Sequence, residues 1–175
     1  VLASLRYEFA IVLPGKDKQA ANLVALAVLI NVVFSLVLLT VILSFTEPIL
    51  KLLRLPREYA LFLYLVPAGV FLFSFYQSLN YWLIRKKRFF HVSLNKFVRR
   101  GTEGSGQLAF MILQKPSGLV LGDILGHMAN VISGTIQAIK SGFSPALISP
   151  AKIRYVSRKY NEYPRFNVLP GFMSA

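Results

Sequence analysis

The 175-residue chain contains no cysteine, and its acidic side chains are scarce, with 7 Asp and Glu against 20 Lys and Arg. The absence of cysteine excludes a disulfide framework, a zinc–thiolate site and catalysis by a thiol. Only two histidines are present, neither in an H-E-x-x-H pair, and the chain has no P-loop G-x-x-x-x-G-K-[ST] motif. We therefore expect no catalytic residues, no metal site, no cofactor and no enzyme activity.

Charge of either sign is also missing from two long stretches, residues 19–46 and 59–84. A helix needs about 20 apolar residues to cross a bilayer core of about 30 Å, and both stretches exceed that length. Charged residues make up 15% of the chain and hydrophobic residues 55%, whereas soluble domains usually carry about 25% charged residues. These features predict an all-α protein, a polytopic bundle of transmembrane helices.

Five helical spans are expected within a transmembrane bundle over residues 1–139, at about 1–14, 20–45, 59–84, 93–114 and 118–139. Hydropathy alone would miss the first half of span 93–114, because that half is charged. Residues 140–168 contain three prolines and a basic cluster, which predicts a partly amphipathic linker on the cytoplasmic surface. Residues 169–175 read as the start of another spanning helix. The chain opens and closes within apolar segments, which is typical of an internal fragment of a larger transporter.

Basic residues are distributed unevenly over the two sides of this predicted bundle. If the spans alternate in direction, 16 of the 20 Lys and Arg lie on the side of loop 85–88 and linker 140–168. Cytoplasmic loops of membrane proteins carry an excess of Lys and Arg, so we assign this side to the cytoplasm. In a soluble protein a net charge of +13 would suggest nucleic acid. Here membrane orientation explains the charge, and we expect no nucleic-acid partner.

Span 118–139 contains three glycines spaced by four residues: Gly118, Gly122 and Gly126. They form two overlapping G-x-x-x-G steps on one helix face. Small residues at this spacing let helix backbones approach closely in lipid. We expect this face to pack against a neighbouring helix, and Gly134 lies off it.

The same span carries a polar stripe on an adjacent face, at helical spacing: Asp123, His127, Asn130 and Gln137. Charged groups at membrane depth are costly and usually face a bundle interior or a wet cavity. Two interpretations of Asp123 and His127 are open. They form an ion or proton relay in a cavity, or they are a carboxylate–imidazole pair whose two groups serve only as each other's polar partner.

Span 93–114 carries a mainly basic stripe: Lys96, Arg99, Arg100, Glu103 and Gln107. Such a helix cannot turn this face to lipid; it either lies in the interface or turns the stripe inward. If inward, Arg99 and Arg100 offer guanidinium forks that match phosphate bidentately, which suits a diphosphate. The candidate substrate-binding residues are Arg6, Arg99, Arg100 and Gln107. Alternatively, the basic side chains snorkel to the cytoplasmic headgroups.

Five stretches carry a family resemblance: RYEFAIVLP (6–14), DKQAANLVAL (17–26), FYQSLNYWLIRKKRF (75–89), LNKFVRRGTEGSGQL (94–108) and KYNEYPRFNVLP (159–170). Together they resemble the oligosaccharide flippases, polysaccharide biosynthesis transporters of the multidrug/oligosaccharidyl-lipid/polysaccharide exporter superfamily. The resemblance covers nearly the whole chain and includes no catalytic signature. It implies a two-lobed transporter, of which this chain forms part of one lobe and residues 140–168 the inter-lobe linker.

The resemblance further implies movement of a polyprenyl-diphosphate-linked oligosaccharide across the cell inner membrane by alternating access. Such transport serves surface polysaccharides such as lipopolysaccharide O-antigen. The partners would be this lipid-linked substrate, membrane lipids, and a polysaccharide polymerase and glycosyltransferases. One alternative is a cation-coupled multidrug exporter of the same superfamily, whose site would favour acidic and aromatic linings. Another is a polytopic membrane enzyme of glycan or lipid assembly.

The predicted topology is testable because the chain offers no cysteine background. We expect Ser141→Cys to react with a membrane-impermeant maleimide only from the cytoplasmic side, because it follows the last predicted span. Glu58→Cys should react only from outside, because it lies between the second and third spans. Labelling of both positions from the same side would contradict the alternation of spans.

Overall fold

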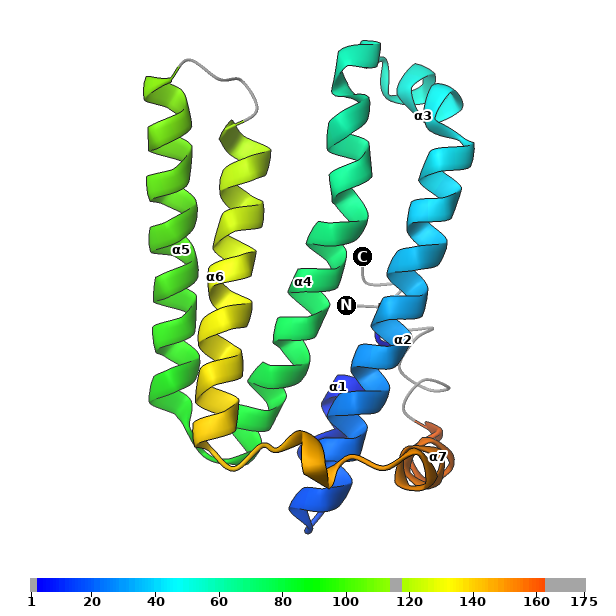
Figure 1. Cartoon of the computed structure of the whole chain (residues 1–175), viewed down its shortest axis with the longest axis vertical. Helices are drawn as coiled ribbons and strands as arrows, with labels where there is room; N and C mark the ends of the chain where they lie inside the picture. Colours follow the sequence, from blue (N-terminus) through cyan, green and yellow to red (C-terminus); the bar gives the residue numbers. More distant parts are fainter. Residues whose placement is uncertain (1–2, 114–117, 163–175) are drawn as a thin grey trace.

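The computed structural model describes residues 3–113 and 118–162, and over these ranges the chain is helical with no strand (Figure 1). The elements in order are α1 (Tyr7–Ala10), α2 (Asp17–Ser44), α3 (Thr46–Leu53), the 3-10 turn η1 (Arg57–Tyr59), α4 (Ala60–Arg85), α5 (Phe89–Ile112), α6 (Gly118–Lys140), the 3-10 turn η2 (Pro145–Leu147) and α7 (Pro150–Lys159). The all-α prediction is confirmed.

Within residues 3–113 and 118–162, three helices are long and apolar enough to cross a membrane: α2, α4 together with the turn before it, and α6. They correspond to the predicted spans 20–45, 59–84 and 118–139. Helix α5 is 24 residues long, but its charged stripe keeps it outside this group. It has the length of a span without the composition of one.

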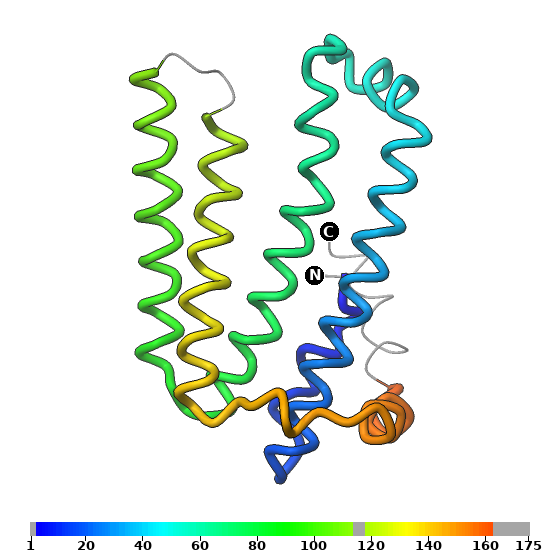
Figure 2. Tube along the Cα trace, in the orientation of Figure 1, coloured from blue at the N-terminus to red at the C-terminus, as the bar shows by residue number. Residues whose placement is uncertain are grey.

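The four long helices stand side by side in the order α5, α6, α4, α2, as the Cα trace in Figure 2 shows. Helix α6 packs against both α5 and α4, and α4 packs in turn against α2. Short helix α3 joins α2 to α4 at one end of the bundle. Helices α4 and α5 are joined directly at the opposite end. This order places α6 between α5 and α4. Helices α5 and α6 carry the two polar stripes and form the charged half of the molecule.

The buried core lies where α2 begins and α4 ends, and α1 and α7 close over it. Trp82, Leu83 and Leu23 are fully buried there, and the Phe143 ring meets Trp82 edge-on with centroids 5.2 Å apart. By contrast, the apolar side chains along the middle of α2, such as Leu36 and Val37, are more than half exposed. Lipid rather than protein suits those surfaces.

The N-terminal segment differs from the expected helical span over 1–14. Its described part contains only a four-residue helix, α1. Leu5 and Arg6 have φ angles of 50° and 63°, a left-handed conformation that is costly for L-residues and interrupts a right-handed helix. The buried Glu8 carboxylate accepts a hydrogen bond from the Ser4 hydroxyl. The prediction of a continuous helix here was wrong because apolar composition does not specify where the backbone turns.

The predicted linker 140–168 is described as far as residue 162 and is ordered into η2 and α7. Asn22 of α2 holds it by donating Nδ2 to the Leu147 carbonyl at 2.9 Å and by accepting Ser149 N–H through Oδ1 at 2.9 Å. Tyr7 donates its hydroxyl to the Ser157 carbonyl at 3.1 Å. The partly amphipathic character is confirmed by α7. The spanning helix predicted from residue 169 lies outside the described residues, as does Gln114 at the end of span 93–114.

The glycine face of α6 packs on α5, as predicted. A Cβ added at Gly122 would lie 3.1 Å from the Gln107 backbone nitrogen and 3.2 Å from the Glu103 carbonyl oxygen. One added at Gly126 would lie 3.1 Å from the Arg99 carbonyl oxygen. Backbone atoms cannot rotate away as side chains do, so a side chain at either position would push the two helices apart by a few tenths of an ångström. The two helices therefore approach more closely than larger residues would permit.

We expect Gly122→Leu to destabilise the protein by about 3 kcal/mol, the upper end of the cost of overpacking. The reason is that its side chain must displace the backbone of α5. The measurement is the thermal stability of the purified protein in detergent, together with its yield from membranes.

The matched control is Gly104→Leu on α5, where an added Cβ meets nothing within 4 Å. Gly134 does not serve as the control, because its added Cβ would lie 3.1 Å from the Tyr76 ring. Equal stabilities of the Gly122 and Gly104 variants would show that the α5–α6 contact is not close.

Candidate functional site

The close contact of α5 with α6 brings the two polar stripes together as a network of charged side chains. Arg99 of α5 donates Nη2 to Oδ1 of Asp123 of α6 at 3.2 Å. The same guanidinium lies 3.9 Å from Glu103, one turn further along α5. Glu103 also accepts a hydrogen bond from Arg100 at 3.1 Å. On the other side, His127 Nε2 lies 3.6 Å from Asp123 Oδ2.

The two arginines occupy different environments. The Arg99 side chain is 22% exposed and points into the contact, whereas that of Arg100 is 72% exposed. Arg99 therefore takes the inward orientation considered from the sequence, and Arg100 the outward one. His127 is buried and meets the Phe73 ring of α4 edge-on, with centroids 5.4 Å apart. The network thus touches three helices.

A hollow of about 270 Å³ opens beside this network, between α4, α5 and α6. Its lining residues are Phe73, Tyr76, Gln77, Asn80, Lys96, Arg99, Arg100 and Asn130. Three of them are cationic and none carries a carboxylate. The carboxylates that pair with Arg99 and Arg100, those of Asp123 and Glu103, are not among the lining residues. An anion entering the hollow would therefore meet a lining with cationic groups and no carboxylate.

Several buried polar atoms around the hollow have no hydrogen-bond partner among the described residues. They are Asn80 Oδ1, Arg99 Nε, His127 Nδ1 and Asn130 Oδ1. A buried polar atom without a partner costs free energy, and most such atoms in folded proteins are bonded. Together these atoms supply both donors and acceptors. This part of the bundle therefore has bonding capacity suited to water or to a polar ligand.

A second polar contact fixes the register of α5 on α6 below the network. Asn95 of α5 is fully buried, and its Oδ1 accepts the Ser133 hydroxyl at 2.6 Å. Gln137 donates Nε2 to the same Ser133 hydroxyl oxygen at 3.2 Å. Ser133 lies almost three turns from Asp123 along α6. This contact positions the charged stripe of α5 without contacting the hollow.

The sequence-predicted site residues separate into two groups. Arg99, Arg100, Asp123 and His127 come together, directly or through Glu103. Gln107 does not line the hollow, because it packs under Gly122 at the helix contact. Arg6 is elsewhere: it directly precedes α1, which packs on α2 and α4, and its guanidinium lies 5.3 Å from the Phe9 ring centroid.

The hollow also contains residues that sequence reasoning did not assign to a site. Gln77 and Asn80 of α4 are not among the predicted site residues, but they line the space. Their spacing of three places them on one face of α4, and this was the available signal. The pairing of Arg99 with Asp123 had no such signal, because the two residues lie on different helices. Asp123 and His127 are thus not a self-contained pair, since Arg99 joins them.

We expect a double-mutant cycle of Arg99→Met and Asp123→Asn to give a coupling free energy of about 1 kcal/mol or more, because the pair is partly buried. The measurement is the free energy of unfolding in detergent for both single variants and the double variant.

The matched control is the pair formed by Arg57 and Glu47, which are 3.2 Å apart with side chains 87% and 56% exposed. Its coupling should be near zero, as for most exposed ion pairs. If the two cycles give the same coupling, then the Arg99–Asp123 contact contributes nothing particular to the fold.

Comparison with known proteins identifies no relative of this chain. No family model, no curated protein and no solved structure matches the chain. The function of the chain is therefore inferred from the geometry of the network and the hollow, together with the sequence resemblance.

Proposed function

We propose that the chain is part of a membrane transporter that moves a polyprenyl-diphosphate-linked oligosaccharide across the cell inner membrane by alternating access. The observation that carries the proposal is the hollow between α4, α5 and α6, with three cationic side chains in its lining and no carboxylate. A diphosphate is the anionic part of such a substrate, and Arg and Lys are the residues that bind it. Uncharged amides beside them suit a polar glycan.

Ion pairing determines how an anion would bind. Among the lining cations, Lys96 has no ion-pair partner within the described residues, whereas Arg99 and Arg100 are engaged by carboxylates. An entering diphosphate would bind Lys96 and compete with Asp123 for the Arg99 guanidinium. Release of Asp123 would in turn change the charge beside His127. This competition supplies a physical link between substrate binding and the contact of α5 with α6.

A multidrug exporter is the less well supported interpretation of the same site. Phe73 and Tyr76 provide aromatic surface, and Asp123 and Glu103 are acidic groups next to the lining arginines. However, both carboxylates are paired with arginine, and neither lines the hollow. A cationic drug would meet Lys96 and Arg99 instead, which repel it.

Arg99→Ala tests the proposal when it replaces the native residue in cells. We expect surface glycan display to fall at least about tenfold, since a charge-assisted hydrogen bond contributes about 1.5–3 kcal/mol. Arg99→Lys should restore display only partly, because lysine retains the charge but not the planar fork. The measurement is cell-surface glycan per unit of protein in the membrane.

The control is Arg54→Ala, which removes an exposed cation at the far end of α3 and should leave display unchanged. Wild-type display from a combined Lys96→Ala and Arg99→Ala variant at normal abundance would contradict a substrate role for the hollow. Loss of drug resistance with normal glycan display would favour the exporter.

A further inference from the structure

Helix α7 lies across the end of the bundle rather than along it. In Figures 1 and 2 the long helices stand upright while α7 is seen end-on. It packs on α2, at the end where α2 begins and α4 gives way to the basic loop 85–88. If the long helices cross a bilayer, α7 runs parallel to the membrane plane. It then lies at the level of the lipid headgroups, where an amphipathic helix is stable.

The two faces of α7 differ sharply. Val156 is fully buried against the core and Ile153 packs beside it. Four cations are exposed on the remaining surface, within eight residues of sequence: Lys152, Arg154, Arg158 and Lys159. No acidic residue occurs in α7. Apart from its anchors to the bundle, the helix therefore presents an unneutralised basic surface.

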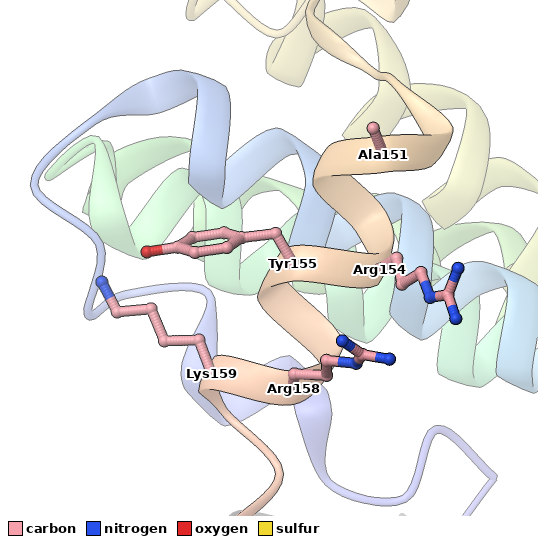
Figure 3. Close-up of a pocket in the computed structure, with 5 residues that line it drawn as sticks. All are labelled: Ala151, Arg154, Tyr155, Arg158 and Lys159. Carbon is pink, nitrogen blue, oxygen red and sulfur yellow. The ribbon is translucent and has the colours of Figure 1, made fainter.

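This basic surface is hollowed, as Figure 3 shows. The hollow has a volume of about 460 Å³ and is lined by Ala151, Arg154, Tyr155, Arg158 and Lys159. Arg154 and Arg158 point to one side of the helix, and Tyr155 and Lys159 to the other (Figure 3). The small Ala151 side chain leaves the space between them open. Residues four apart on a helix are neighbours, so the two guanidinium groups can bind one phosphate together.

The contacts of α7 and the preceding turn with the bundle order this surface before any ligand binds. The Asn22 amide holds the chain at Leu147 and Ser149, and Tyr7 holds α7 itself at Ser157. Lys159 lies over two aromatic rings, with Nζ 5.8 Å from the Tyr155 centroid and 5.5 Å from that of Tyr160. A tyrosine at this level is also typical of membrane interfaces. Little further ordering of the backbone is needed for an anion to bind.

From these observations we propose that α7 binds the headgroups of anionic phospholipids in the cytoplasmic leaflet. The cytoplasmic leaflet carries a negative surface potential, and Lys and Arg clusters on amphipathic helices are attracted to it. Phospholipid headgroups are the occupants because α7 lies in their plane and because they bring phosphate to its surface from the side. The inference concerns anchoring of the helix and does not depend on which substrate the bundle transports.

The experiment uses the intact protein in lipid nanodiscs, with a fluorescent donor on Asn161→Cys just beyond α7. Acceptors are trace amounts of phosphatidylglycerol or phosphatidylcholine labelled on the acyl chain, so that the headgroups are native. We expect phosphatidylglycerol to be enriched near α7 by about fivefold over phosphatidylcholine, which corresponds to about 1 kcal/mol for one neutralised cation. Arg154→Gln with Arg158→Gln should reduce this ratio to near one.

The matched control removes two other exposed cations from the same end of the bundle, Lys87→Gln with Arg88→Gln. This variant should keep most of the enrichment, because its cations do not line the hollow. Equal losses of enrichment in the two double variants would show that diffuse charge attraction, and not a site on α7, causes the enrichment. No enrichment in the native protein would overturn the proposal. Loss of enrichment on adding inorganic phosphate at constant ionic strength would assign the hollow to soluble phosphate instead.

Discussion

The absence of side chains at Gly122 and Gly126 is the constraint on which the charged half of this molecule depends. A Cβ at either position would lie 3.1 to 3.2 Å from backbone atoms of α5, so the present approach of the two helices depends on glycine. That approach determines which polar groups meet: Arg99 reaches Asp123, and Asn95 reaches Ser133. Close packing and charge pairing are thus one feature. The glycines set the distance, and the polar side chains set the register.

The stripe of α5 explains why this helix needs α6. A charged side chain facing hydrocarbon is expensive, and α5 carries four such residues along one face: Lys96, Arg99, Arg100 and Glu103. In the structure, Glu103 neutralises Arg100 within the helix and Asp123 neutralises Arg99 from α6. Lys96 is left beside the hollow with no ion-pair partner within the described ranges. The net positive charge of the site is therefore the charge that remains after these ion pairs have cancelled.

Sequence reasoning predicted the elements better than their partners. Charge-free runs identify α2 and α4, and an apolar run that contains Asp123 identifies α6, because a bilayer imposes length and composition on any helix that crosses it. The glycine triplet predicted a contact face, and the stripes predicted inward-facing polar groups. Which helix meets which face is a three-dimensional property, so Asp123 as partner of Arg99 and the roles of Gln77 and Asn80 were missed. Arg6 and Gln107 were assigned by charge and spacing, and neither lines the hollow.

Local turns were the least predictable features. Leu5 and Arg6 break the first segment although both are compatible with helix, and only the backbone of the structure reveals it. Pro150 is one of the prolines of the predicted linker, and proline is favoured at the first position of a helix, where it has no N–H to lose. It begins α7 there, after Ser149.

The Asn22 amide has a mechanical consequence. Its oxygen and nitrogen bind the linker on both sides of Ile148, so this stretch is fastened to α2 by the type of bidentate contact that two strands make with each other. A pull on the chain beyond α7 would therefore be felt first by α2, at the end where this helix begins, and only then by α6, from which the linker departs. Force entering through the linker would tilt the apolar half of the bundle while the glycine-packed pair α5 and α6 moves as a unit. The hollow lies between these two halves, so such a tilt would change its width without breaking the ion pairs behind it.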